Sequence, residues 1–134
     1  MTNTAVQTQS RGQVQRTLSQ KVQKLYKNQI GHAPGKVNCQ IVNNTVTLIA
    51  EDSLTKLEQL LLEGENAQGT PIQVDVEQMR SDLDKAIRPA LIDTLEKILS
   101  VEVIDILSDT TLETGRTAIV VVLSEAPSFN SGDQ

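Results

Sequence analysis

Aromatic residues, cysteine and histidine are scarce in this chain of 134 residues, which has one Tyr, one Phe, one Cys, one His and no Trp. A single cysteine excludes an internal disulfide and any zinc site built from clustered thiolates. A single histidine, His32, excludes a multi-histidine metal site and leaves His-dependent catalysis one candidate base in a Gly- and Pro-containing loop. Two aromatic rings provide almost no surface on which nucleic-acid bases could stack.

Long apolar runs and nucleotide-binding motifs are also missing. The longest charge-free apolar run, AIVVVL at 118–123, is far shorter than the roughly 18 residues that a membrane-spanning helix needs. The N-terminal MTNTAVQTQSR lacks the apolar segment of a secretory signal, so we expect a cytoplasmic protein without a transmembrane segment. No phosphate-binding glycine loop, dinucleotide-binding glycine motif or EF-hand pattern occurs. We therefore expect no enzymatic activity, no cofactor and no metal site.

The charges are strongly divided along the chain, although the net charge is only −5. Residues 1–50 contain six basic residues and no acidic one, whereas the other six bases and all 17 acids follow from Glu51 onward. Such an asymmetry predicts either an acidic external partner or attraction between the two segments, within one chain or across a dimer. Self-complementarity is the simpler of these interpretations.

The first third of the chain predicts a helix followed by a hairpin. Apolar residues at helical spacing indicate a basic amphipathic helix over residues 11–30, which ends where Gly31 and Pro34 occur. The segment KVNCQIVNNTVTLIAE predicts two strands with Asn43 and Asn44 in the turn. This register places on one face Val37, Cys39, Ile41, Val46, Leu48 and Ala50. Cys39 is then a small core residue rather than a nucleophile.

The middle of the chain predicts further helices. Thr55 and Glu58 have the spacing of a capping box, which opens a short helix. Its buried side is expected to contain Leu57, Leu60 and Leu61. A longer helix is expected over residues 74–100, with a buried stripe formed by Val76, Met79, Leu83, Ile87, Leu91, Leu95 and Ile98. Pro89 predicts a bend in this helix, and two helices meeting near residue 88 are the alternative.

The last part of the chain predicts two β-strands, VEVIDILSD and GRTAIVVVLS, joined by a turn with Ser108, Asp109 and Gly115. Both faces of the final strand are apolar, which indicates a central strand covered on both sides, by helices or by a second subunit. We expect an α+β fold with a four-stranded, mainly antiparallel sheet, helices packed on it and the order αββααββ. One domain over residues 11–124 is expected between disordered tails at 1–10 and 125–134.

The basic helix is the main candidate for contact with a partner. It supplies the positive charge that nucleic-acid phosphates require, but stacking aromatics, a helix-turn-helix and a KH-type loop are missing. Contact with an anionic membrane is another interpretation, although no Trp or Phe would anchor the helix, and packing on its own sheet is the simplest. Asp84 and Arg88, at i, i+4 spacing, predict a surface ion pair on a solvated helix face.

Three segments in a fixed order carry a family resemblance. In LTKLEQLLLEG the matching residues are Leu54, Thr55 and Glu58. In MRSDLDKAIRPALIDTLEKIL they are Arg80, Arg88, Pro89 and Leu91. In VIDILSDTTLETGRTAIVVVL they are Ser108, Asp109, Thr114 and Gly115. Over about residues 11–125 the chain resembles the MpsC family, the C component of a sodium-translocating, membrane-potential-generating system.

The resemblance implies an accessory or regulatory role beside membrane components that handle cations and inorganic carbon. We therefore expect a non-enzymatic, homodimeric protein that modulates a membrane transport system. A nucleic-acid-binding or small-ligand-sensing regulatory module is the alternative, with nucleic acid the less favoured partner. The residues expected to contact a partner are Arg16, Lys21, Lys24, Lys27, Arg80, Arg88, Asp109, Thr114 and Arg116.

Overall fold

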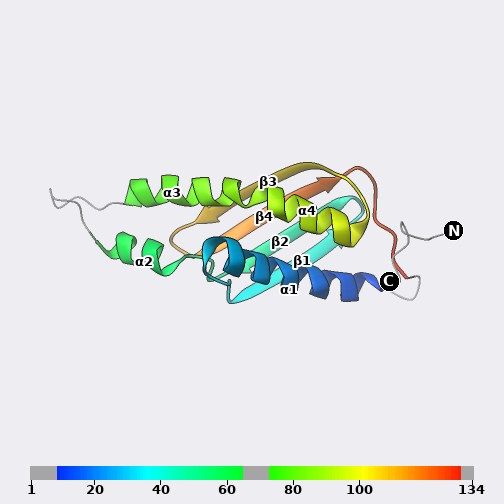
Figure 1. Cartoon of the computed structure of the whole chain (residues 1–134), viewed down its shortest axis with the longest axis horizontal. Coiled ribbons are helices and arrows are strands. Elements are labelled where there is room, and N and C mark those ends of the chain that lie inside the picture. Colours follow the sequence, from blue (N-terminus) through cyan, green and yellow to red (C-terminus); the bar gives the residue numbers. More distant parts are fainter. Residues whose placement is uncertain (1–8, 65–72, 131–134) are drawn as a thin grey trace.

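The computed structural model describes residues 9–64 and 73–130, which form one β-sheet with helices packed on it (Figure 1). The elements in chain order are α1 Arg11–Ile30, β1 Lys36–Val42, β2 Thr45–Glu51, α2 Lys56–Glu63, α3 Gln73–Ala86, α4 Arg88–Leu99, β3 Val103–Thr111 and β4 Arg116–Leu123. The predicted α+β class and the order αββααββ are confirmed, with the expected long helix divided into α3 and α4.

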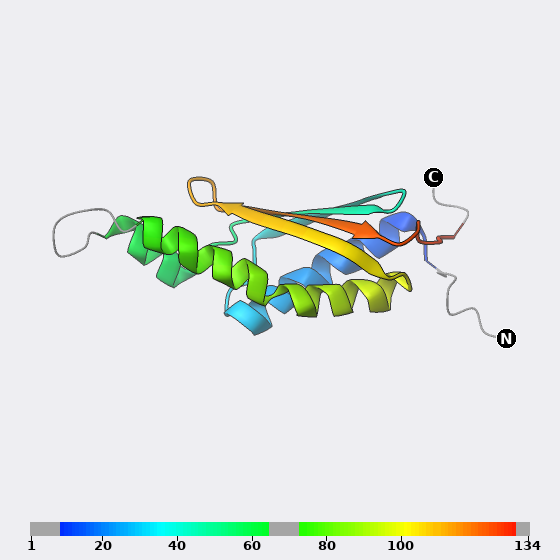
Figure 2. The same ribbon diagram turned by 90° about the horizontal axis from the view of Figure 1, so that it is seen from above.

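The sheet has the strand order β1-β2-β4-β3, and each neighbouring pair is antiparallel. The predicted hairpin register is confirmed, because Val37 lies opposite Ala50 and Cys39 lies opposite Leu48. Asn43 in the turn has φ 54°, a left-handed conformation that Asn tolerates. The strand β4 is central, as predicted. The helices lie on one face of the sheet only, and no described element covers the other face (Figure 2).

Helix α1 begins and ends at the residues that its sequence predicts. Ser10 caps the first turn, where its hydroxyl accepts from the Gln13 amide at 3.2 Å and its own amide donates to the Gln13 side chain at 2.9 Å. Gly31 closes the helix in a left-handed conformation with φ 88°. The side chains buried against the sheet are Val14, Leu18, Val22 and Tyr26. Tyr26 thus completes the buried stripe, and the adjacent Leu25 is only partly buried.

The break between α3 and α4 lies at Ile87, and the alternative of two helices is confirmed. Pro89 is placed in the first turn of α4, where backbone amides have no partner within the helix and its missing N–H costs nothing. The α4 residues buried against the core are Leu91, Leu95 and Leu99. Proline therefore starts a second helix here instead of bending a continuous one.

Burial of α2 differs from the prediction. Leu57 and Leu60 are 58% and 60% exposed, whereas Glu58 is completely buried. The reason is the ion pair that Glu58 makes with Arg80, which turns the carboxylate toward the sheet and the two leucines toward solvent. Leu61 is partly buried in a small apolar cluster with Leu54 and neighbouring residues of α3.

Part of the expected C-terminal tail contacts the domain. Phe129 packs against the core, and the guanidinium of Arg11 lies 5.3 Å from the centre of its ring. The amide of Asn130 donates to the backbone oxygen of Gln9 at 3.0 Å. These contacts involve residues that the sequence assigned to the tails, and the expected tail segments 1–8 and 131–134 lie outside the described residues.

Candidate functional site

The exposed side of α1 carries four basic side chains, Arg16, Lys21, Lys24 and Lys27, which we call the basic face. Helix α1 contains no acidic residue. In the described parts of the chain, each ion pair involves other residues, so the charge of the basic face is not neutralised there. All four are among the residues predicted to contact a partner, and the structure has them exposed together on one helix.

Three members of the basic face border an open hollow of about 650 Å³ on the outer side of α1, together with residues that include Thr17 and Ala33. These members are Lys21, Lys24 and Lys27. The loop beside the hollow is held to the helix, because Gln23 Nε2 donates to the backbone oxygen of Pro34 at 3.1 Å. Three ammonium groups around one open hollow attract an anionic group or an acidic protein surface.

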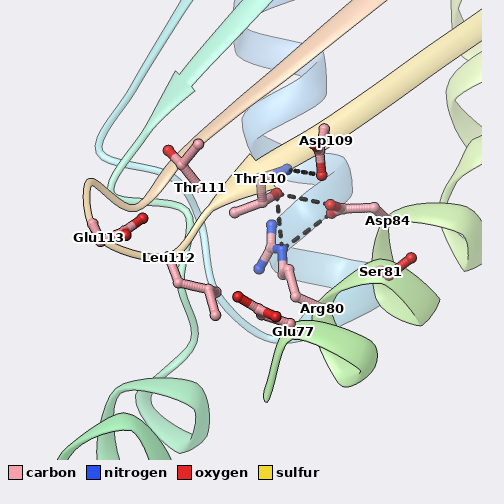
Figure 3. Close-up of a pocket in the computed structure, with 9 residues that line it drawn as sticks. All are labelled: Glu77, Arg80, Ser81, Asp84, Asp109, Thr110, Thr111, Leu112 and Glu113. Atoms are coloured by element: carbon pink, nitrogen blue, oxygen red, sulfur yellow. Dashed lines mark hydrogen bonds and ion pairs between the residues drawn. The ribbon is translucent and has the colours of Figure 1, made fainter. Parts of the chain in front are cut away.

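Arg80 on α3 is buried, unlike the bases of the basic face, and its side chain is only 2% exposed. Its Nη1 donates to Glu58 Oε1 at 3.0 Å and to the Ser53 backbone oxygen at 2.9 Å. Its Nε donates to Asp84 Oδ1 at 3.1 Å (Figure 3). Its Nη2 donates to Thr117 Oγ1 at 3.3 Å. Arg80 is thus not available to a partner, contrary to the expectation from the sequence, because its donors are used inside the fold.

Hydroxyl groups complete this arrangement, which we call the Arg80 network: Ser53, Glu58, Arg80, Asp84, Thr110 and Thr117. Thr110 Oγ1 donates to Asp84 Oδ2 at 2.7 Å and lies 2.6 Å from Thr117 Oγ1. Thr117 Oγ1 in turn lies 2.6 Å from Ser53 Oγ. The predicted capping box is confirmed and joins the network, because Thr55 donates to the same Glu58 oxygen that pairs with Arg80.

The Arg80 network separates two apolar clusters. Along the buried side of α3, Val76 belongs to the small cluster, Arg80 and Asp84 follow, and Ile87 belongs to the main core. Along β4, Thr117 precedes the core residue Ile119. The network thus forms a polar layer between the small apolar cluster at the α2–α3 end of the molecule and the main core beneath the sheet.

Charge in the layer is unbalanced, with one guanidinium between the carboxylates of Glu58 and Asp84. Burial raises the pKa of Asp84 above its usual range, against the opposing effects of the Arg80 charge and the Thr110 hydrogen bond. Burial, together with the nearby Asp84 charge, also raises the pKa of Tyr26 to about 12. Among the described residues, Glu58 Oε2 and the Tyr26 hydroxyl are buried without a hydrogen-bond partner.

A polar pocket of about 340 Å³ lies between α3 and the end of β3, beside Arg80 and Asp84 (Figure 3). Its other charged lining residues are Glu77, Asp109 and Glu113. The predicted surface pair of Asp84 with Arg88 is wrong, because Asp84 turns inward to Arg80. Arg88 donates instead to Ser108 Oγ at 2.9 Å, which ties the start of α4 to β3.

The other predicted contact residues lie near the β3–β4 connection. Asp109 and Ser108 are strand residues of β3 and not turn residues, whereas Gly115 does supply a positive φ of 71°. Thr114 is hydrogen bonded to Thr111, and Arg116 Nε lies 2.9 Å from Glu51 Oε1. The nine predicted residues therefore divide between the basic face and this end of the sheet, and do not form one site.

Catalysis or metal binding would use the single cysteine, the single histidine or a group of metal-ligating side chains. Burial raises the pKa of Cys39 to about 12, so its sulfur is a thiol and not a nucleophilic thiolate at neutral pH. His32 Nε2 lies 2.7 Å from the backbone oxygen of Asp52. Within residues 9–64 and 73–130, no three His, Cys, Asp or Glu side chains are grouped to hold a metal ion.

Sequence reasoning missed the Arg80 network. Val76, Arg80, Asp84 and Ile87 follow one another at steps of four, four and three, so the two charged residues lie on the apolar stripe. This spacing was the available signal for their burial. Ser53 and Thr117, which supply partners from distant elements, gave no signal of their own.

Comparison with known proteins gives one informative result. No curated protein and no solved structure matches the chain. No helix in the described residues has the length and apolar character to cross a membrane. Residues 10–125 match the family described as "Na+-translocating membrane potential-generating system (MpsC)", a span that includes every helix and strand of the fold. The chain therefore belongs to the MpsC family.

Proposed function

We propose that this protein is a non-enzymatic, cytoplasmic accessory or regulatory subunit that binds a membrane cation or inorganic-carbon transport system through its basic face. The family name supports an association with a membrane-potential-generating system. The observation that carries the proposal is the exposed, unneutralised basic face on a helix without acidic residues. An acidic surface of the transport system is the complementary partner.

The charge distribution of the whole chain supports a directed encounter. From Glu51 onward the acids outnumber the bases by 17 to six, while all charges before Glu51 are positive. An acidic partner is therefore attracted to α1 and repelled by most of the remaining surface. Such complementarity steers association and makes its rate depend on ionic strength.

Nucleic acid is the less favoured partner for the same bases. The single Tyr of the chain is buried, with 1% of it exposed, and the single Phe packs against the core. Little aromatic surface is thus left to stack on bases, and phosphate attraction alone gives weak, salt-sensitive binding. Binding to an acidic protein surface does not require aromatic residues for stacking.

Affinity capture from detergent-solubilised cells tests the proposal. The wild-type chain should recover an integral membrane transport protein, and the triple variant Lys21→Glu, Lys24→Glu, Lys27→Glu should recover at least about tenfold less. The matched control reverses three exposed lysines outside α1, in Lys56→Glu, Lys85→Glu, Lys97→Glu, and should retain capture. Recovery of soluble proteins alone, or equal loss in both triple variants, contradicts the proposal.

A gel-shift assay with duplex DNA and structured RNA at low salt separates the two partner classes. We expect no shift at protein concentrations that saturate capture of the transport protein. A salt-sensitive shift that disappears in the Lys21, Lys24, Lys27 triple variant, without recovery of a membrane protein, supports the nucleic-acid alternative instead.

A further inference from the structure

The sheet face opposite the helices is apolar at its centre and uncovered by the described residues (Figure 2). Val120 of β4 lies at its centre, with Leu107 of β3 beside it, and Leu107 is 55% exposed. Val42 at the end of β1 is 61% exposed. The geometry points to a homodimer in which two copies of this chain pack these faces together with their strands aligned.

The alternation of the strands defines this face. Val46, Leu48, Ile119 and Val121 are buried beneath the helices, so their neighbours along β2 and β4 point to the opposite side. These neighbours are Thr45, Thr47, Ile49, Ala118, Val120 and Val122. A strand with apolar residues on both faces is typical of a sheet that is covered on both sides. A second copy can cover the open side with the same apolar residues.

We call the uncovered side of the sheet, opposite the helices, the open face. Its positive and negative charges lie on different strands. The edge strand β1 contributes Lys36 and no acid, whereas the opposite edge strand β3 contributes Asp105 and Asp109 and no base. Between them, Glu51 of β2 and Arg116 of β4 form an ion pair at 2.9 Å. The two edges therefore carry charges of opposite sign.

A twofold axis parallel to the strands brings the two edges together, with Lys36 over Thr111 of the partner subunit and one level away from Asp109 of the partner subunit. It places β1 over β3 of the second copy and β2 over β4, at the usual spacing of roughly 10 Å between packed sheets. Glu51 then lies over Arg116 of the partner subunit, because cross-strand register puts both at the same level of the sheet. At the next level, Ile49 lies over the small side chain of Ala118 of the partner subunit.

A twofold axis across the strands gives a poorer match. It reverses the levels, so that Leu107 lies over Asp109 of the partner subunit and Val122 lies over Arg116 of the partner subunit. Each of these contacts buries a charge against an apolar side chain, which is unfavourable. The aligned arrangement makes one such contact type, between Val42 and Asp105 at a corner of the face. Charge and packing therefore select the aligned dimer.

Light scattering at micromolar concentration tests the dimer. The wild-type chain should have twice the 14.6 kDa mass of one copy. Val120→Asp should raise the dissociation constant at least about a hundredfold, since two unpaired carboxylates would be buried at the centre. Lys24→Asp, which alters charge on α1 away from this face, should remain dimeric. A wild-type mass of one copy overturns the proposal, as does an unchanged dimer in Val120→Asp with native circular dichroism.

A mixing experiment tests the axis. Arg116→Glu places two acids in register across the interface, and Glu51→Arg places two bases there, so each variant alone should be monomeric. An equimolar mixture of the two should form dimers with one copy of each, because every facing charge is then opposite. Both variants disturb the internal pair equally, so a stability effect cannot produce this recovery. A mixture that stays monomeric, or homodimers of either variant, overturns the aligned arrangement.

The dimer and the proposed function fail independently. The open face and the basic face lie on opposite sides of the sheet. A monomeric Val120→Asp chain that still captures the transport protein separates the interface from the docking surface. If the triple variant Lys21→Glu, Lys24→Glu, Lys27→Glu loses capture but still forms dimers, the docking surface is likewise separate from the dimer interface.

Discussion

Basic side chains occur in two regions of this fold whose surroundings are opposite. Arg80 is 2% exposed and donates to groups on several elements, including Glu58 and Asp84. The basic face of α1 is exposed and makes no ion pair within the described residues. The side of the helix on which a base lies thus decides whether the base is buried or exposed. A base on the buried side joins elements of the fold, whereas bases on the outer side are exposed, and we propose that these exposed bases bind a partner.

Replacing a buried base should destabilise the fold far more than replacing exposed ones. All free energies of unfolding are compared at one protein concentration, because dimerisation would otherwise shift the values.

The largest effect is expected from Arg80→Met. Without the guanidinium, Glu58 and Asp84 are left as buried carboxylates with no cation, which costs about 3–5 kcal/mol of unfolding free energy. Urea unfolding at neutral pH measures this loss. The exposed pair of Lys97 with Asp93 is the matched comparison, and Lys97→Met should cost less than about 0.5 kcal/mol. Equal, small losses in both variants contradict a structural role for the Arg80 network.

The apolar core provides the next comparison. Leu95 on α4 is completely buried beneath the sheet, and Leu95→Ala should cost about 3 kcal/mol through lost burial and a residual cavity. The same urea titration measures it. Because no charge is involved, this loss of stability should not change with salt concentration. Binding of the basic face to its partner, in contrast, should weaken as the salt concentration rises. A salt-dependent loss for Leu95→Ala contradicts the assignment of this region as a dry core.

A smaller effect is expected from Asp84→Asn, and its pH dependence identifies the group. Since the pKa of Asp84 is raised above the usual 3.8, the folded state binds this proton more tightly than the unfolded chain. The resulting stabilisation is complete below the unfolded pKa and is lost as the pH rises through the folded pKa. The stability of wild type minus that of Asp84→Asn should therefore fall as the pH rises above about 4. At neutral pH the two should differ by about 1 kcal/mol or less. A difference that rises over this range contradicts the raised pKa.

The smallest effect on stability is expected from Lys21→Glu, Lys24→Glu, Lys27→Glu. These side chains make no ion pair within residues 9–64 and 73–130. Lys27 lies in the last turn of α1, where a positive charge interacts favourably with the helix dipole. Thermal unfolding should show a loss of at most about 1 kcal/mol, mostly from this position. A loss comparable with that of Arg80→Met contradicts the assignment of the basic face to partner binding.

The secondary structure could be predicted because local signals agree with the fold. The hairpin register follows from Asn43 and the alternation around it, and α1 ends where Gly31 allows a left-handed residue. The Arg80 network could not be predicted in the same way. Arg80 and Asp84 have the spacing of an ordinary surface pair. Only the tertiary approach of Ser53 and Thr117 supplies partners that make burial of the charges possible.

The orientation of α2 shows the same limit. Leu57 and Leu60 have the spacing of a buried stripe, yet both are exposed because Glu58 is drawn inward by Arg80. One tertiary ion pair therefore decides which side of a short helix is buried. The basic face was predictable, since the bases of α1 lie off an apolar stripe that the sequence shows clearly.

Sedimentation with membranes tests the central claim that the exposed bases, and not the buried one, carry the function. Inverted vesicles from cells that contain the transport system are compared with vesicles made only from their extracted lipids. The wild-type chain should sediment with the native vesicles but not with the lipid-only vesicles. The Lys21, Lys24, Lys27 triple variant, folded to the same extent, should stay in the supernatant with both. Equal sedimentation of the wild type and the triple variant, or equal binding of the wild type to native and lipid-only vesicles, contradicts the role proposed for the basic face.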